Sequence, residues 1–275
     1  MTQTGQETTE TIATDRGYSL AFKRREGKTP WVVFLGGFRS DMSGTKAEYL
    51  DGWCADRGQA YLRLDYSGHG HSGGRFESGS ISAWTLDALD VLKSLQNAPC
   101  VLVGSSMGGW IMLRVALALS SQVKGLVGIA AAPDFTRDMI SRDLNATQRQ
   151  QLVDQGKITL TSEYDPEGFV LTQAFIEDGE RCCLLDRPID IDIPVRLLQG
   201  CRDAEVPWQT ALRLQDALRT DDVIVQLLKN GDHRLSDPGQ LELMGATLAR
   251  LLESVESKVE SKVESNVEIN KVGAD

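Results

Sequence analysis

The sequence is short of the side chains that metal sites, disulfides and membrane spans require. Its 275 residues hold only three histidines, His69, His71 and His233. The five cysteines are odd in number and none forms a C-x-x-C pair, so neither a disulfide framework nor a zinc site is indicated. Free thiols in a reducing compartment are expected instead. No run approaches 18 apolar residues, so we expect no membrane-spanning helix.

Positive charge is also scarce relative to negative charge. There are 29 Lys and Arg against 39 Asp and Glu, a net charge of −10. Such a chain repels phosphate backbones, so nucleic acid is not an expected partner. Residues 1–10 show no basic start followed by an apolar stretch, which argues against a secretory signal and favours a cytoplasmic protein. With 41% hydrophobic and 25% charged residues, the composition is that of a globular protein with a real core.

Short apolar runs alternate with segments of helical spacing along most of the chain. Continuous apolar runs of this length are typical of strands buried on both faces of a parallel sheet. The alternation predicts an α/β fold with a mostly parallel, doubly wound sheet. The expected strands are 18–24, 31–35, 60–66, 100–103, 123–132, 195–199 and 223–228, and the expected helices are 46–57, 82–95, 110–119, 208–218 and 240–252.

The alternation breaks at residues 134–190, which are more polar and carry helical pieces without a clear strand. We expect a small cap here, inserted after the fourth predicted core strand. Its apolar side chains line a substrate pocket or form the cap's own core, and the sequence leaves both possibilities open. They are Phe135, Met139, Ile140, Phe169, Leu171, Phe175 and Ile176.

The two ends differ in composition from the predicted main domain, residues 18–253. Residues 1–17 are polar and rich in threonine, and are expected to be flexible. In the tail, residues 254–275, valines recur every four residues, which is neither a heptad seam nor a regular core stripe. A partly helical, solvated extension is predicted. The alternative is an arm through which the chain forms a homo-oligomer, since marginal helices need a partner.

One motif carries a specific chemical prediction. Residues 104–108 read Gly-Ser-Ser-Met-Gly and fit G-x-S-x-G, between an apolar run and an apolar helical segment. A strand–turn–helix context of this kind exposes a nucleophile above the sheet at a helix N-terminus, which favours developing negative charge. Ser106 is the predicted nucleophile. The alternative is a glycine-rich turn whose serine only caps the helix.

A serine hydroxyl needs a base, and a nucleophile on such a turn is followed in the chain by an acid and then a histidine. His233 fits this order, because it follows the last predicted strand, whereas His69 and His71 precede the motif. Asp203 is the predicted acid because it comes soon after the strand 195–199; Glu205 is the alternative. The acid would hold the imidazole in the required tautomer.

The same fold context predicts an oxyanion hole from two backbone N–H groups. They are those of Met107, directly after the nucleophile, and Phe38, which follows the strand 31–35 and two glycines. An ordinary Gly-Gly turn is the alternative.

His69 and His71 have a chelating spacing but no obvious third ligand, so we expect a structural turn or a pocket rim there. Tyr66, Trp110 and Trp208 could line a pocket, although core packing is favoured.

Together these segments resemble the α/β-hydrolases from about residue 18 to 253. More specifically, the chain is similar to the group that includes the mitochondrial abhydrolase palmitoyl-protein thioesterases and their bacterial relatives. The matching segments are GGFRSDMSGTKA (36–47), RLDYSGHGHSGG (63–74), VLVGSSMGGW (101–110), GCRDAEVPW (200–208) and NGDHRLSD (230–237).

The resemblance implies a small cap, no cofactor, and hydrolysis of esters or thioesters. We accordingly expect a small-molecule ester or S-acyl substrate and no metal. It implies Ser106 as nucleophile, Asp203 as acid and His233 as base, with Phe38 and Met107 as oxyanion donors. The predicted function is therefore a serine hydrolase that works through an acyl-enzyme. A lactonase, a C–C bond hydrolase or a peptidase could use the same triad. A non-catalytic binding protein stays a further alternative, because fold does not imply function.

Overall fold

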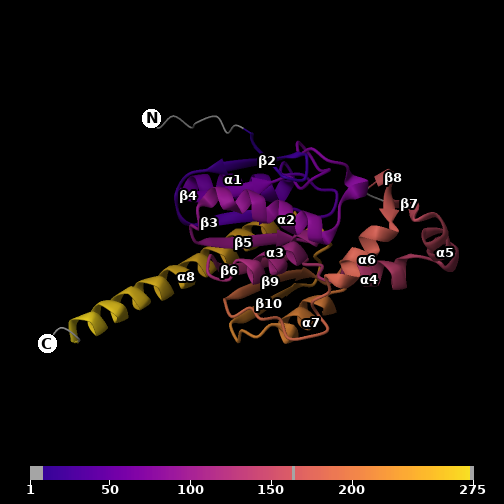
Figure 1. The fold of residues 1–275 in the computed structure, drawn as a ribbon. Helices are drawn as coiled ribbons and strands as arrows, with labels where there is room; N and C mark the ends of the chain where they lie inside the picture. Colours follow the sequence, from indigo (N-terminus) through magenta and orange to yellow (C-terminus); the bar gives the residue numbers. More distant parts are fainter. Residues whose placement is uncertain (1–8, 163–164, 273–275) are drawn as a thin grey trace.

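An eight-stranded sheet forms the centre of the molecule, in the order β1-β2-β4-β3-β5-β6-β9-β10 (Figure 1). The computed structural model describes residues 9–162 and 165–272. Six neighbouring strands run parallel, from β4 to β10, whereas β2 pairs antiparallel with both β4 and β1. This confirms the predicted α/β class and mostly parallel sheet. The strands are β1 (Glu10–Ala13), β2 (Ser19–Arg25), β3 (Lys28–Leu35), β4 (Gln59–Leu64), β5 (Cys100–Ser105), β6 (Val123–Ile129), β9 (Val195–Gly200) and β10 (Val223–Leu228).

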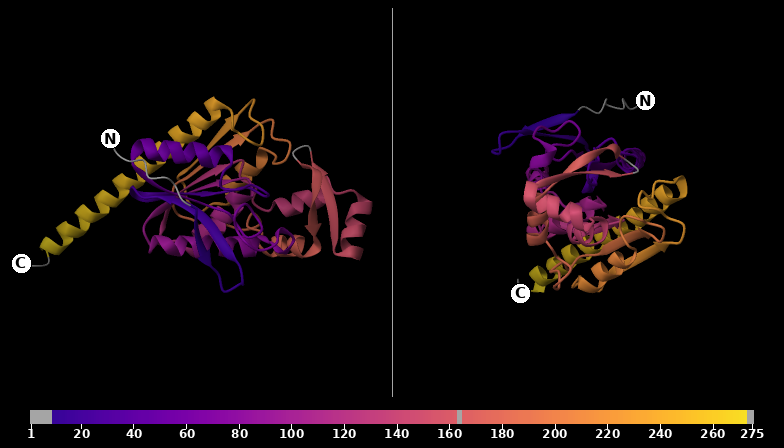
Figure 2. Two further views of the ribbon diagram at one scale, coloured as in Figure 1. Left: turned by 90° about the horizontal axis from the view of Figure 1, so that it is seen from above. Right: turned by 90° about the vertical axis from the view of Figure 1, so that its right-hand side faces the viewer.

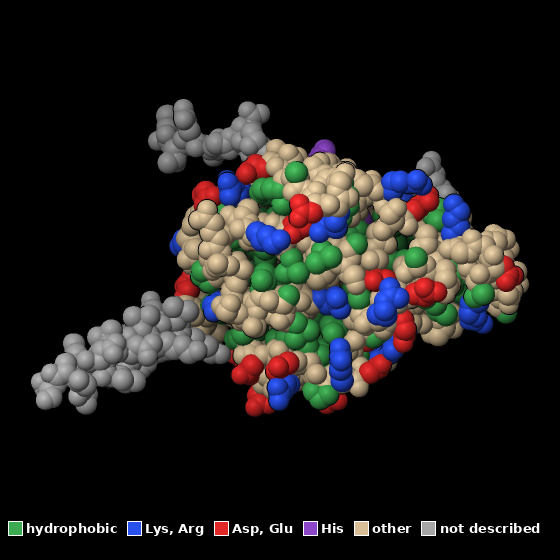
Figure 3. All heavy atoms as spheres, in the orientation of Figure 1, with side chains coloured by type: hydrophobic (Ala, Val, Ile, Leu, Met, Phe, Trp, Pro, Cys, Tyr) green, Lys and Arg blue, Asp and Glu red, His purple; other side chains and the backbone are tan. Residues whose placement is uncertain are grey.

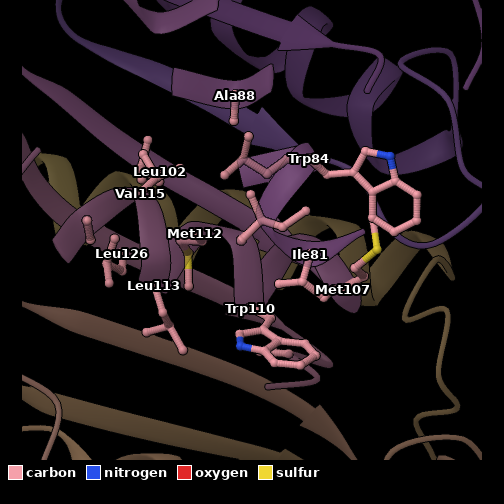
Figure 4. Close-up of a cluster of buried hydrophobic side chains, with 14 of the residues drawn as sticks. Ile81, Trp84, Ala88, Leu102, Met107, Trp110, Met112, Leu113, Val115 and Leu126 are labelled. Atoms are coloured by element: carbon pink, nitrogen blue, oxygen red, sulfur yellow. The ribbon is translucent and has the colours of Figure 1, made fainter. Parts of the chain in front are cut away.

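Helices cover both faces of the sheet and give the molecule two hydrophobic cores (Figure 2). The first core lies between the sheet and α2, α3 and α7, and includes the buried rings of Trp84 and Trp110 (Figure 4). The second lies between the sheet and α1 and α8, and includes Leu50 and Leu248. The central strands are buried from both sides, which explains their continuous apolar runs. The helices are α1 (Thr45–Arg57), α2 (Ile81–Leu92), α3 (Met107–Ala118), α7 (Gln209–Ala217) and α8 (Pro238–Val272).

The surface over α2 and α3 is mixed in character. Figure 3 shows hydrophobic, acidic and basic side chains interspersed on this face. Leu86 of α2 and Leu117 of α3 are among the exposed ones. Single exposed apolar side chains are ordinary on protein surfaces and do not by themselves indicate a partner. None of the described helices combines the length and apolar character needed to cross a bilayer.

The order of the strands determines where a ligand can bind. The chain passes from β3 to β4 on one side, then returns to β5 on the other side of β3. At such a switch point the loops that follow two neighbouring parallel strands leave in opposite directions, which opens a crevice at their carboxyl ends. The loop after β3 and the turn after β5 therefore lie next to each other.

The segment between β6 and β9 projects beyond the carboxyl ends of the central strands as a cap (Figures 1 and 2). The expectation of no clear strand there is wrong, because β7 and β8 form an antiparallel hairpin. Its signal was a short alternation, with Ile158 opposite Leu171 and Leu160 opposite Phe169 on one face. The cap elements are α4 (Phe135–Asp138), a π-helical turn (Met139–Asp143), α5 (Ala146–Gln155), β7 (Lys157–Ser162), β8 (Asp165–Thr172) and α6 (Gln173–Arg181).

The cap shares its core with the main body. Leu171, Phe175 and Ile176 are buried in the first core, and Phe135 and Phe169 pack against it. The remaining two predicted cap side chains, Met139 and Ile140, also pack there. In the described part of the cap, these side chains therefore face the body and do not form a separate cluster.

Both ends of the described chain carry more regular structure than the composition suggests. Within residues 1–17, for which the composition predicts flexibility, β1 pairs with β2, and Glu10 forms a 2.9 Å ion pair with Arg24. Residues 1–8 lie outside the described part. At the other end, α8 runs unbroken through the predicted tail boundary and extends beyond the sheet, away from the cap (Figure 1). Val255 is buried in the second core. Residues 273–275 also lie outside the described part, and the oligomerisation arm stays a prediction.

Candidate active site

Ser106 lies on a strained turn between β5 and α3. Its backbone has φ 54° and ψ −121°, a conformation that non-glycine residues adopt at a cost. The surrounding backbone is packed closely. A Cβ at Gly108 would lie 2.0 Å from the Leu35 carbonyl oxygen, and one at Gly104 would lie 2.5 Å from the Gly108 oxygen. The glycines of G-x-S-x-G are therefore required by contact between the turn, the strand β3 and the first residues of α3.

His233 approaches Ser106 from the loop between β10 and α8. Its Nε2 is 2.9 Å from Ser106 Oγ, and its side chain is only 13% exposed. The two residues are 127 positions apart in sequence, so only the fold brings them together. A neutral imidazole with a bare Nε2 can accept the hydroxyl proton of serine, which is the arrangement of an activated nucleophile.

Asp203 lies on the other side of the imidazole, in the loop after β9. Its Oδ2 is 2.9 Å from His233 Nδ1. Oδ2 also accepts a hydrogen bond from Gln199 Nε2, and Oδ1 accepts the N–H groups of Glu205 and Val206. Burial raises the pKa of Asp203, but His233 first, and then the backbone N–H groups of Val206 and Glu205, outweigh it and lower the pKa below its usual value. Asp203 is therefore held as a carboxylate that fixes the proton of His233 on Nδ1.

Glu205 occupies a different position from the one that an acid of the triad requires. Its Oε2 is 3.3 Å from His233 Nε2, the nitrogen that also faces Ser106. The Glu205 side chain is 47% exposed, whereas that of Asp203 is fully buried. The structure thus pairs Asp203, and not Glu205, with Nδ1.

The two predicted oxyanion donors belong to two segments that meet at Ser106. A Cβ at Gly37 would be 3.4 Å from the Ser106 Cβ, so the loop that carries Phe38 touches the nucleophilic turn. Met107 is the first residue of α3, where the backbone N–H has no partner within the helix. Within the described residues, neither the Phe38 nor the Met107 N–H makes a hydrogen bond. Both amides are therefore available to a ligand oxygen.

The other two histidines do not join this constellation. His69 is buried, with Nδ1 3.1 Å from the Ser67 carbonyl oxygen and Nε2 3.1 Å from the Arg39 amide nitrogen. The side chain of His71 is exposed. Throughout the described chain, no three His, Cys, Asp or Glu side chains gather as a metal site.

The predicted pocket aromatics have different surroundings. Tyr66 and Trp110 are buried in the first core, as core packing predicts. Trp208 is half-buried just before α7. Phe38 instead lies at the centre of a ring cluster, with centroid distances of 5.1–6.1 Å to five rings. These are Phe76, Trp84, Phe135, Phe169 and Phe175.

This aromatic cluster joins the cap to the oxyanion loop. Three of its rings come from α4, β8 and α6 of the cap, and the others from the body. A small cavity lies among Phe38, Trp84 and Phe175, with the β8 residues 170–172 on its cap side. Its lining also includes Glu77 and none of the three residues Ser106, Asp203 and His233, so Phe38 is the link between this cavity and the oxyanion loop.

Two supporting residues carry little signal in the sequence. Gln199 ends β9 and donates to Asp203, and its only sequence signal is a polar residue at the end of an apolar strand. Lys46, near the start of α1, donates through Nζ to the carbonyl oxygen of Arg234, the residue after His233. Burial lowers the pKa of Lys46 to about 8. Its signal was the Gly-Thr-Lys sequence that opens the helix, which gives no hint of the distant partner.

Known proteins share this architecture and much of this sequence. Residues 30–168 match the family described as serine aminopeptidase, S33. Mitochondrial palmitoyl-protein thioesterase ABHD10 from Mus musculus is 38% identical over 240 residues, which cover 87% of this chain and 80% of that protein. The human protein of the same name is 36% identical over the same share of this chain and 78% of its own length.

Solved structures agree with these relatives. A putative hydrolase from Agrobacterium vitis S4 superimposes with a TM-score of 0.85 at 41% identity, covering 90% of this chain and 99% of that one. The mouse α/β hydrolase domain-containing protein 10 does so with a TM-score of 0.84 at 36% identity, with the same coverage. Since both sequence and structure match over most of the length, the chain is a hydrolase that belongs to the α/β-hydrolase family, in the group of the palmitoyl-protein thioesterases named ABHD10.

Proposed function

We propose that this hydrolase cleaves carboxylic esters or acyl thioesters through an acyl-enzyme formed on Ser106. The observation that carries the proposal is the continuous hydrogen-bonded series from Ser106 Oγ through His233 to Asp203, with both contacts at 2.9 Å. His233 Nε2 takes the hydroxyl proton while Ser106 Oγ attacks the acyl carbon. The tetrahedral oxyanion is bound by the N–H groups of Phe38 and Met107.

The same groups complete acylation and then carry out deacylation. The protonated His233 donates its proton to the leaving alcohol or thiol, and the acyl group stays on Ser106. His233 then removes a proton from water, which attacks the acyl carbon. The bond between Ser106 Oγ and the acyl carbon breaks, Oγ takes the proton back from His233, and the acid is released. Asp203 stays ionised throughout and stabilises the imidazolium. No step requires a cofactor.

The aromatic cluster supports an apolar acyl group as the part of the substrate that the cap binds. Phe38 carries both a proposed oxyanion donor and the central ring of the cluster. An acyl chain that leads away from the attacked carbon would therefore meet rings of the body and the cap. The relatives named palmitoyl-protein thioesterase agree with such a substrate.

Labelling with a fluorophosphonate tests the nucleophile. Intact-protein mass spectrometry should show one adduct on the wild type and none on Ser106→Ala. p-Nitrophenyl esters and acyl thioesters of graded chain length would then identify the preferred substrate. A folded wild type that gives no adduct and no hydrolysis would overturn the proposal.

A peptidase is the second candidate, because the family that matches residues 30–168 is described as a serine aminopeptidase. The same nucleophile would attack an amide carbonyl. Aminoacyl 4-nitroanilides distinguish the two functions: turnover of these amides at rates above those of the esters would favour the peptidase.

A further inference from the structure

The loop that carries the proposed oxyanion donor contains an unusual turn. Ser40 N–H donates to the Gly37 carbonyl oxygen at 3.1 Å and closes a four-residue turn over residues 37–40. The Gly37 carbonyl shares its peptide plane with the Phe38 N–H, so this bond sets the direction of the donor. Arg39, the third residue of the turn, has φ 59°. Glycine or asparagine is preferred at a left-handed position of this kind.

An arginine in this conformation needs support from its surroundings, because a left-handed non-glycine residue is strained. One support is the bond from Arg39 N–H to His69 Nε2, at 3.1 Å, which acts on the backbone of the turn. The Arg39 guanidinium also lies over the rings of Phe76 and Phe169, 5.9 and 5.3 Å from their centroids. His69 Nδ1 lies 3.1 Å from the Ser67 carbonyl oxygen, which can only accept. The proton of the imidazole therefore belongs on Nδ1, and Nε2 offers a lone pair to Arg39.

The position of His69 is fixed on several sides. Its ring centroid is 5.1–5.8 Å from those of Tyr66, Phe76 and Trp84. Burial lowers the pKa of His69, which keeps Nε2 unprotonated and able to accept. The next residue, Gly70, has φ +47°, and a Cβ there would lie 2.1 Å from an Asp65 carboxylate oxygen. The loop that holds His69 therefore has little freedom to move.

A second contact ties the same two loops together. The buried Asp65 accepts the N–H of Met42 at 2.7 Å and the N–H of His71 at 2.8 Å. Met42 follows the turn of residues 37–40, and His71 follows His69. Asp65 thus holds the loops at the correct distance, while His69 contacts the turn itself.

We propose that His69 is a positioning residue for the oxyanion hole, whose Nε2 holds the Arg39 N–H and thereby the turn that directs the Phe38 N–H at the reacting carbonyl. This inference rests on the proposed function. It assigns a role in the reaction to the first histidine of the Gly-His-Gly-His segment, which lies outside the triad and outside any metal site of the described residues.

The test compares His69→Gln with His69→Met. The two side chains have nearly the same shape, but only glutamine has a carbonyl oxygen at the end of the chain that can accept the Arg39 N–H. His71→Ala is the control, because its exposed side chain lies two residues away. The readouts are kcat and KM for a p-nitrophenyl ester and the Ki of a trifluoromethyl ketone, which forms a tetrahedral oxyanion on the serine.

For His69→Met we expect kcat to fall by about 10²-fold, the loss typical of one oxyanion donor, with little change in KM. The Ki of the ketone should rise in parallel, because the same oxyanion is affected. His69→Gln should recover most of both losses, and His71→Ala should match the wild type. If His69 had a purely structural role, both variants would have a lower melting temperature, and kcat would not fall selectively while KM stays constant.

If the wild type is active and the folded His69→Gln and His69→Met variants have equal kcat and KM, the inference is overturned but the proposed function is not. A wild type that neither reacts with a fluorophosphonate nor hydrolyses esters would overturn the proposed function, and the inference with it. If both variants fail to fold, amide hydrogen exchange of the wild type decides. The Arg39 amide is on an exposed residue, and rapid exchange there would show that His69 does not hold it.

Discussion

At the scale of single residues, Ser106 combines the hydroxyl that we propose as the nucleophile with a backbone conformation that costs stability. Its φ of 54° lies in a region that glycine adopts without strain and that other residues adopt only at an energetic cost. The strain follows from the need to expose Oγ above the sheet at the start of α3.

We therefore predict that Ser106→Gly is more stable than Ser106→Ala by about 1–3 kcal/mol, since glycine relieves the strain and alanine does not. Both variants lack the hydroxyl and should be inactive, so the comparison isolates the backbone. Urea denaturation of the two proteins measures the difference. Equal free energies of unfolding would show that the turn is not strained.

The two acidic residues beside His233 should differ sharply in their effect on catalysis. Asp203→Asn removes the carboxylate on Nδ1 and permits the wrong tautomer, so kcat should fall by about 10⁴-fold. Glu205→Gln removes a half-exposed carboxylate on the Nε2 side, and a change of less than about tenfold is expected. Steady-state kinetics on one ester substrate checks both. A larger loss in Glu205→Gln would reverse the assignment.

Asp203 should also affect stability in a pH-dependent way. Its pKa is lower in the folded protein than in the unfolded chain, so folding is favoured by its ionised form. This contribution is fully present above the unfolded pKa, about 3.9, and is lost as the pH falls through the lower folded value. The difference in unfolding free energy between wild type and Asp203→Asn should therefore become less favourable to the wild type below about pH 4. A difference that stays constant from about pH 6 to about pH 3 would contradict this.

At the scale of secondary structure, the contact between α3 and β3 holds the nucleophile against the oxyanion loop. Gly108 has no room for a side chain, because a Cβ would meet the backbone of Leu35 and Gly36. Any larger residue there must move α3 away from β3, and hence Ser106 away from Phe38.

Gly108→Ala should for this reason lower both stability and kcat, by more than about 3 kcal/mol in unfolding free energy, as overpacking against rigid backbone does. Gly52→Ala is the matched control. Gly52 lies inside α1 with nothing within 4 Å of its absent Cβ, so alanine should stabilise the helix by about 0.5–1 kcal/mol. Chemical denaturation and ester kinetics on both variants test the pair. Normal activity in Gly108→Ala would show that the turn at Ser106 tolerates displacement.

The sequence predicted the elements that repeat a strong local pattern. The apolar runs of β3, β5 and β6 and the turn at Ser106 each carry their signal within a few residues, so their identification required no knowledge of tertiary contacts. β7 and β8 were missed because two short alternating segments in a polar region resemble loop. β1 was missed because its stability comes from pairing with β2 and from the ion pair of Glu10 with Arg24.

The residues of the site could likewise be predicted only where their signal is local in the sequence. His233 and Asp203 could be chosen from chain order, because few histidines compete and the acid comes directly after a strand. Gln199, Lys46 and His69 act through contacts with residues that lie 4, 188 and 30 positions away. The two distant contacts leave no periodic mark in the sequence, and only the folded chain reveals them.

At the scale of the whole molecule, α8 connects the catalytic domain to the valine-rich tail. Val255 is buried in the second core, so the part of α8 that stabilises the domain reaches at least this residue. The prediction of an oligomerisation arm therefore concerns the residues of the tail beyond Val255.

A chain that ends after Ser257 should keep the stability of the full protein to within about 0.5 kcal/mol, because it retains Val255. Val255→Ala in the full chain should cost about 1.5 kcal/mol, the transfer free energy of two methylene equivalents. Thermal denaturation compares the three proteins. Light scattering then tests the arm, since identical oligomeric states with and without the tail would refute it.

The separation of Ser106 and His233 by 127 positions has a consequence for synthesis in the cell. The nucleophile, its turn and both oxyanion amides leave the ribosome well before the base does. At a translation rate of about 5–20 residues per second, the delay is about 6–25 seconds. During that interval the nascent chain carries a serine without its base, so acyl transfer cannot begin. On the proposed mechanism, a newly made chain therefore gains its esterase activity only after β10 and His233 have been synthesised.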